Sequence, residues 1–155
     1  MRMGTVGADT RPVGIRRGTP EDAAVIAELN EQLGYPGTVD EVRRRLVELR
    51  AREGEQAVFV ACLGLHVVGW VDVALTFHLQ SPAYALIGGL VVREGIRGLG
   101  IGKRLCEEAE AWSRAQGVPV VRVTSRSTRA DAHRFYLRDG YSELKTSRVF
   151  EKRLD

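Results

Sequence analysis

The chain of 155 residues has little of what disulfide-linked, metal-binding and membrane proteins need. It contains only two cysteines and three histidines, and Cys62 and Cys106 fall in a predicted strand and a predicted helix. That number and placement suit neither a disulfide framework nor a cluster of metal ligands. No apolar run approaches the ~20 residues that a membrane-spanning helix requires. We therefore expect a metal-free cytoplasmic protein with no membrane segment.

Strong charge of one sign is also missing. The net charge is +3, charged residues make up 28% of the chain, and no Lys/Arg run is interleaved with aromatic residues. This composition argues against a nucleic-acid partner and leaves a mild preference for anionic ligands. Residues 1–11 are polar and glycine-rich without a signal-peptide core, so we expect a flexible tail there. The remaining length, 12–155, suits one domain.

One stretch, Leu90–Lys103, changes character twice. It begins with the apolar Leu90, Val91 and Val92, and then glycines alternate at 98, 100 and 102. From Ile101 the apolar spacing is helical, which predicts a strand, a turn and a helix N-terminus. The first N–H groups of a helix lack intrahelical acceptors, and glycines allow a ligand to approach the backbone closely. With Arg97 and Lys103 nearby, the stretch is typical of a phosphate site.

Two common phosphate-binding motifs do not fit this stretch. A dinucleotide fingerprint needs Gly-x-Gly-x-x-Gly, and a P-loop needs four residues between its glycines followed by Lys and Ser or Thr. The sequence Arg97-Gly98-Leu99-Gly100-Ile101-Gly102 instead resembles motif A of the GNAT superfamily of acyl-CoA-dependent N-acyltransferases. That motif is Gln or Arg, two residues, Gly, one residue, and Gly or Ala.

The rest of the chain predicts one mixed sheet with helices on both faces, an α/β (α+β) fold. Hydrophobic spacing and turn residues predict strands at 12–17, 56–62, 66–77, 84–92 and 118–125, and a final hairpin within 141–154. Helices are predicted at 19–33, from Thr38 or Val39 through Leu49, at 98–116 and at 130–139. Residues 85–123 form a strand–helix–strand unit, which should be parallel, whereas its neighbours are hairpins. We expect about six to seven strands, mostly antiparallel.

A second signature strengthens the resemblance. Residues 132–141 read Ala-x-x-Phe-Tyr, three residues, and Gly-Tyr, which is similar to the second GNAT motif. Order, spacing and strand content agree over roughly residues 12–154. Leu33-Gly34-Tyr35-Pro36, Gly69-Trp70 and 148–152 make the chain most similar to the bacterial aminoglycoside 6'-N-acetyltransferase-like group.

The resemblance implies a GNAT fold, with central parallel strands that splay apart, and a site for acetyl-CoA. The backbone of Leu90, Val91 and Val92 would face the pantetheine arm and the acetyl carbonyl. The residues expected to hold the pyrophosphate are Arg97, Gly98, Leu99, Gly100, Ile101, Gly102 and Lys103. Tyr136 would protonate the departing thiolate, since a phenol is protonated at neutral pH. Tyr35 and Tyr84 would line the acceptor side.

The chain departs from the family at the general base. Many relatives carry a Glu on the strand of motif A, and the two corresponding positions here are Leu86 and Gly88, neither of which takes up a proton. Asp72 and His78 are nearby alternatives, and a chain of water molecules serves equally well.

The expected function is acetyl-CoA-dependent N-acetylation of a small amine. Two alternatives stay open: acetylation of a protein lysine or N-terminus, and a CoA-binding regulatory module without turnover, which the missing carboxylate favours. By analogy with relatives, we also expect a homodimer that pairs through the final strands.

Overall fold

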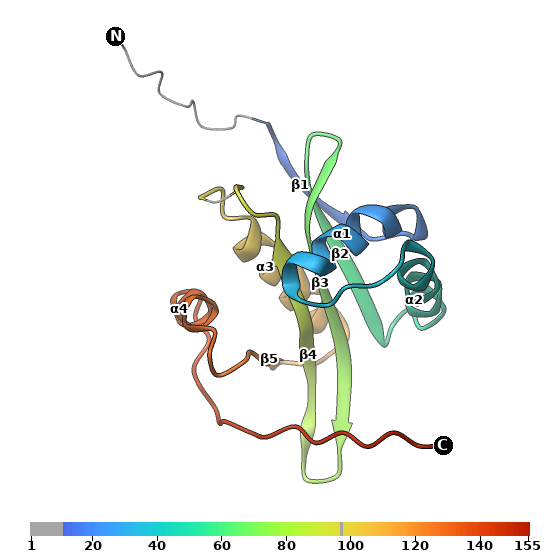
Figure 1. The fold of residues 1–155 in the computed structure, drawn as a ribbon. Coiled ribbons are helices and arrows are strands. Elements are labelled where there is room, and N and C mark those ends of the chain that lie inside the picture. Colours follow the sequence, from blue (N-terminus) through green and yellow to red (C-terminus); the bar gives the residue numbers. More distant parts are fainter. Residues whose placement is uncertain (1–10, 97) are drawn as a thin grey trace. The chain divides into compact units, whose positions relative to one another are not determined.

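The computed structural model describes residues 11–96 and 98–155, and its contacts divide them into two compact units (Figure 1). The first unit ends at Val123, and the second begins at Thr124. Most of the predicted flexible tail, residues 1–10, lies outside the described residues, as does Arg97.

The first unit is built on a sheet whose strands lie in chain order. The described strands are β1 (Val13–Arg17), β2 (Gln56–Leu63), β3 (His66–His78), β4 (Ser81–Val92) and β5 (Val121–Val123). The first three pairs of neighbours are antiparallel, and β4 and β5 are parallel. The predicted parallel strand–helix–strand unit is thus confirmed.

Local signals place the helices. The 3₁₀ helix η1 (Pro20–Asp22) leads into α1 (Ala23–Leu33), which ends at Gly34 with φ of 95°. A capping box between Thr38 and Glu41 starts α2 (Val39–Ala51). The other helices are α3 (Ile101–Ala115) and α4 (Ala130–Arg138). None of the described helices is long and apolar enough to cross a membrane.

Helices cover both faces of the sheet in the first unit. Trp70 of β3 packs against the apolar cluster formed by Ile26 and Leu29 of α1 and Leu46 of α2. The preceding residue, Gly69, lies against Leu105 of α3. Because consecutive residues of a strand point to opposite faces, α3 covers the face opposite α1 and α2, as Figure 1 shows.

The final hairpin predicted for 141–154 is wrong. The described part of the chain holds five strands rather than six to seven, and 141–155 has no regular secondary structure. Its apolar residues, including Val149 and Phe150, are exposed. Alternating apolar residues form a strand only when a neighbouring strand and a core accept them. Similarly, β5 is shorter than predicted, since it begins only after Pro119, which has no N–H to donate to a sheet.

A bidentate ion pair joins β1 to η1. Both guanidinium nitrogens Nη1 and Nη2 of Arg16 donate to the Asp22 carboxylate at 2.8 Å, and the Thr19 N–H donates to it at the same distance. Asp22 is only 7% exposed. The hydrogen bonds from Arg16, chiefly, hold the pKa of Asp22 below its usual value. The ion pair therefore stabilises the protein at neutral pH.

Replacing this carboxylate tests that stabilisation. We expect Asp22→Asn to lower the free energy of unfolding at pH 7 by about 1–3 kcal/mol, the range for hydrogen bonds to charged groups. Because the pKa is lowered in the folded state, the stabilisation exists above the unfolded pKa of ~4 and is lost as pH falls through the folded pKa. The difference in melting temperature between the two proteins should therefore shrink as pH falls below the usual carboxyl range. Asp40→Asn is the control, since Asp40 forms an exposed pair with Arg43 that should contribute under ~0.5 kcal/mol.

Candidate active site

The edge of β4 has no strand paired with it over its last residues in the described part of the chain. Pairing with β5 covers only Ala85, Leu86 and Ile87, whereas pairing with β3 continues to Val92. The described residues therefore place no strand beside 88–92 on the side away from β3.

Backbone groups at this edge point away from the sheet. Arg93 N–H donates to the Val68 carbonyl at 2.7 Å, so residues 93 and 68 form a hydrogen-bonded pair. In an antiparallel ladder such pairs alternate with pairs that do not bond each other. Leu90 and Val92, which pair with Val71 and Gly69, consequently direct their N–H and C=O groups outward. This is the arrangement that the prediction for Leu90 and Val92 needs, with Val91 facing β3 between them.

The end of α1 holds the end of β4. The Gln32 amide donates from Nε2 to the Val92 carbonyl at 2.7 Å, and its Oε1 accepts from the Glu94 N–H at 2.8 Å. Arg93 also forms an ion pair with Glu28 at 2.6 Å. The Val92 carbonyl is therefore already bonded within the protein, and its N–H is the group left for a ligand. Sequence reasoning missed Gln32 because nothing in its surroundings marks it.

A glycine-rich turn connects β4 to α3. Gly95, Gly98 and Gly100 have φ of 83°, 79° and 68°, in the left-handed region that favours glycine. Gly100 is the N-cap, and the first helical hydrogen bond runs from the Arg104 N–H to its carbonyl. The N–H groups of residues 101–103 precede that bond, so the turn presents the positive end of a helix. The helix therefore begins at Ile101 and not at Gly98 as predicted.

The predicted pyrophosphate residues are only partly described. Arg97 lies outside the described residues. A Cβ atom built on Gly98 or Gly100 would meet no heavy atom within 4 Å, so the turn borders open space. Leu99 is half-buried and Ile101 is buried under the turn. Lys103 is exposed, with its ammonium 4.0 Å from the Glu107 carboxylate.

Two glycines in β4 accommodate side chains of β3. A Cβ on Gly88 would lie 3.0 Å from Asp72 Oδ1, and a Cβ on Gly89 would lie 2.6 Å from the Trp70 ring. The register shifts here, because Asp72 pairs with Gly89 and Val73 with Ile87, which leaves Gly88 as a bulge. The group that approaches Gly88 most closely is thus the carboxylate of the neighbouring strand.

The Asp72 carboxylate is firmly held. Its Oδ1 accepts the Gly89 N–H at 2.6 Å. Burial raises the pKa of Asp72 above its usual value, and the backbone N–H groups of Gly89 and Gly88 oppose that rise. The result is a shielded carboxylate that binds a proton more readily than one in water.

The two predicted acceptor residues have different surroundings. Tyr35 is 59% exposed in the connection between α1 and α2, and its N–H donates to the Asn30 carbonyl. Tyr84 is buried, with its hydroxyl 3.1 Å from His78 Nε2 and the Arg122 guanidinium 4.0 Å above its ring. His78 is thereby placed at the β3–β4 hairpin, six residues along β3 from Asp72, which is roughly 20 Å in an extended strand.

Tyr136 belongs to the second unit. It lies on α4, half-buried, with its ring edge-to-face with Phe135 at 5.2 Å and with Tyr141 at 5.7 Å between centroids. Its carbonyl accepts the Tyr141 N–H at 3.0 Å. This packing orients the side chain within the unit, and its catalytic role stays a prediction.

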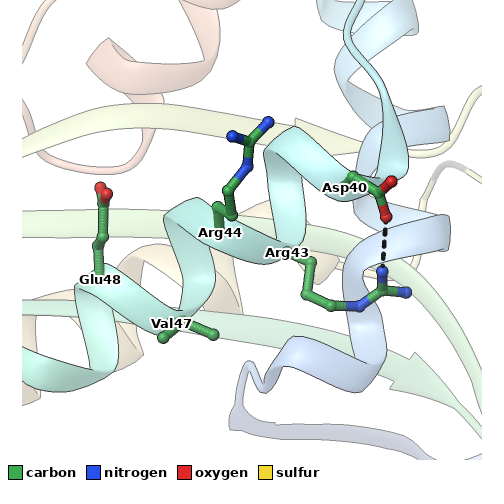
Figure 2. Close-up of a pocket in the computed structure, with 5 residues that line it drawn as sticks. All are labelled: Asp40, Arg43, Arg44, Val47 and Glu48. Atoms are coloured by element: carbon green, nitrogen blue, oxygen red, sulfur yellow. Dashed lines mark hydrogen bonds and ion pairs between the residues drawn. The ribbon is translucent and has the colours of Figure 1, made fainter.

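A surface hollow along α2 is a poor candidate for the site. It is lined by residues of this helix alone, which are Asp40, Arg43, Arg44, Val47 and Glu48 (Figure 2). Figure 2 shows Arg44 pointing away from Arg43, whose guanidinium is bonded to Asp40. The arginines of α2 are exposed, as is typical of a solvated helix face.

Comparison with known proteins identifies the family. Residues 23–141 match the acetyltransferase (GNAT) family. An aminoalkylphosphonate N-acetyltransferase of Salmonella typhimurium is 33% identical over 148 residues, which span 87% of this chain and 89% of that protein. An aminoglycoside N(6')-acetyltransferase type 1 of Stenotrophomonas maltophilia is 31% identical over 140 residues, 87% of this chain and 88% of that protein.

Solved structures agree with the fold. The aminoglycoside N-acetyltransferase AAC(6')-Iy, in complex with CoA, superposes with a TM-score of 0.82 at 17% identity, over 93% of this chain and 97% of that one. A transcriptional regulator from Bacillus halodurans C-125 gives 0.80 at 24% identity, over 91% and 100%. The resemblance deduced from the two motifs is confirmed, and the chain belongs to the GNAT family of acetyltransferases.

Proposed function

We propose that this GNAT enzyme transfers an acetyl group from acetyl-CoA to the primary amine of a small molecule, by direct attack in a ternary complex. The observation that carries the proposal is the edge of β4, where Leu90 and Val92 direct backbone groups outward just before a glycine turn and the N-terminus of α3. An extended pantetheine arm can pair with such an edge, and a pyrophosphate can bind at such a helix end. Both sequence relatives act, by name, on small amines.

Each predicted residue has a part in this scheme. The N–H of Val92 would bond the pantetheine arm, and the N–H of Leu90 would donate to the oxygen of the acetyl carbonyl as it gains negative charge. The backbone of Gly98, Gly100 and Gly102 would receive the pyrophosphate, with Arg97 and Lys103 adding positive charge. Tyr136 would give its proton to the departing thiolate. Holding the amine and the thioester together supplies much of the rate.

The acceptor is the less defined partner. Aminoalkylphosphonates carry an anionic group, whereas aminoglycosides carry several amines. The +3 charge of the chain suits an amine with an anionic group better than a polycation. Tyr35 and Tyr84 are proposed to line its side of the site. A single domain over 12–155, a cytoplasmic location and a homodimer remain proposals from the sequence.

An acceptor panel tests the function. We expect free thiol to be released from acetyl-CoA with at least one aminoalkylphosphonate or aminoglycoside, and not with lysine-containing peptides. Thiol release should equal the acetylated amine found by mass spectrometry. Turnover with peptides alone would favour the protein acetyltransferase alternative, and binding without turnover on every amine would favour the regulatory module.

A matched pair of variants tests the pyrophosphate site. Gly100→Asp adds a negative charge where the phosphates would sit, and Gly100→Asn has nearly the same shape without the charge. Both residues tolerate the left-handed conformation of Gly100. The repulsion should be worth about 1–4 kcal/mol, or roughly ten- to thousandfold in acetyl-CoA affinity. The rise in melting temperature on adding acetyl-CoA measures it. Equal shifts in the two variants would place the pyrophosphate elsewhere.

A tyrosine pair tests the proton donor. Tyr136→Phe removes the hydroxyl and keeps the ring that packs on Phe135 and Tyr141, so kcat should fall while acetyl-CoA affinity stays nearly unchanged. General acids contribute ~10²–10⁴-fold, and we expect the low end because a thiolate leaves readily. Tyr141→Phe is the control and should leave kcat intact. A folded Tyr136→Phe enzyme with wild-type kcat would exclude Tyr136 from the proton transfer.

A further inference from the structure

We propose that Asp72 is the general base of this enzyme, and that it replaces from β3 the carboxylate that many relatives carry on β4. The proposal rests on the acetyl transfer proposed above and adds a named residue to it. The observation that supports it is that the Asp72 carboxylate of β3 lies against Gly88 of β4.

Asp72 reaches the position from which a β4 side chain would act. A Cβ on Gly88 would point toward the Asp72 carboxylate and lie 3.0 Å from its Oδ1. Gly88 itself is exposed, so the carboxylate lies beneath a part of β4 that has no side chain covering it. His78 is excluded from this place, because it lies at the far end of β3 and its Nε2 contacts the Tyr84 hydroxyl.

The tandem glycines are matched to this arrangement. A side chain at 88 would displace the carboxylate, and one at 89 would meet the Trp70 ring at 2.6 Å. A Glu at position 88 would also bring two carboxylates into contact, which like charges oppose. The Asp72 carboxylate therefore occupies the space that a side chain at position 88 would need, so a carboxylate at 72 excludes one at 88.

The backbone links this base to the oxyanion donor. The Gly89 N–H holds Asp72 Oδ1 at 2.6 Å on the β3 side. Leu90 is the next residue, and its N–H points to the opposite side, toward the exposed edge. Successive Cα atoms lie ~3.8 Å apart. An amine in contact with Asp72 and a carbonyl bonded to Leu90 would thus be adjacent.

The proton balance is simple. As the amine nitrogen bonds to the acetyl carbon, its proton passes to the Asp72 carboxylate. The C–S bond then breaks, and the thiolate takes a proton from Tyr136 or water. Asp72 returns its proton to solvent, and Tyr136, where it is the donor, takes one back from solvent. Burial favours the protonated form of Asp72, which makes the carboxylate a stronger base than one in water. The two residues of β4 that approach it, Gly88 and Gly89, are uncharged.

Asp72→Asn is the central test, since Asn keeps an oxygen for the Gly89 N–H. We expect kcat/KM for the acceptor to fall by ~10²–10⁴-fold, with the acetyl-CoA-induced rise in melting temperature unchanged. The loss should shrink across a series of acceptors whose amines have lower pKa values, because the nitrogen of their tetrahedral adduct is more acidic and loses its proton to water more readily. The melting temperature should not fall, because the substitution removes a buried charge.

Asp72→Ser supplies a second, independent readout. It leaves space beside Gly88, so added formate should restore turnover in this variant and not in Asp72→Asn. His66→Asn, at the exposed start of β3, is the control on the same strand and should keep wild-type activity. Wild-type kcat/KM in folded Asp72→Asn overturns the proposal, as does a loss that is equal for all amines and is not rescued by formate. Failure of both variants to fold would assign Asp72 to the fold instead.

The test separates this proposal from the function on which it rests. If the wild-type enzyme acetylates no amine of the panel, the proposed function fails, and the role of Asp72 fails with it. If the wild type acetylates an amine and Asp72→Asn does so equally well, only the role of Asp72 fails.

Discussion

The structure depends on one unequal pairing: β4 has β3 beside it as far as Val92, but β5 only as far as Ile87. A strand edge presents backbone donors and acceptors that must bond to something. Here the Gln32 amide donates a hydrogen bond to the Val92 carbonyl. The other outward backbone groups of Leu90 and Val92 face the side without a paired strand, where an extended ligand can bond to them. The parting of two parallel strands is therefore what leaves the backbone groups that the proposed cofactor site uses.

The neighbouring elements fix the position of this edge and of the turn that follows it. Gln32 and the Glu28–Arg93 ion pair fix the point where the chain leaves β4, and the positive φ of Gly98 and Gly100 turns it directly into α3. The helix N-terminus thus comes immediately after the exposed edge along the chain. A ligand with an extended amide-bearing arm and a phosphate end matches that order, and for this reason the proposed cofactor site consists mostly of backbone groups.

How far the sequence predicts this structure depends on the range of the interactions. The start of α2 and the glycine turn follow from neighbouring residues, and both were predicted correctly apart from the exact start of α3. The hairpin at 141–154 failed because a strand needs a partner that its own pattern does not specify. Asp72 was only one of three alternatives, beside His78 and a chain of water molecules, because its contact with Gly88 depends on a bulge that shifts the register between β3 and β4.

The fold alone does not explain a carboxylate at position 72. Asn would also accept the Gly89 N–H, and it would do so without the desolvation that raises the Asp72 pKa. When the pKa of an acidic group is raised in the folded state, the free energy of unfolding falls as pH rises through that pKa. At neutral pH the charge of Asp72 therefore opposes folding. Groups that oppose folding in this way gather at sites where chemistry requires them. The same burial that lowers stability makes the carboxylate a better proton acceptor. A proton acceptor for the attacking amine is the group that the motif A strand lacks, because its positions 86 and 88 are Leu and Gly.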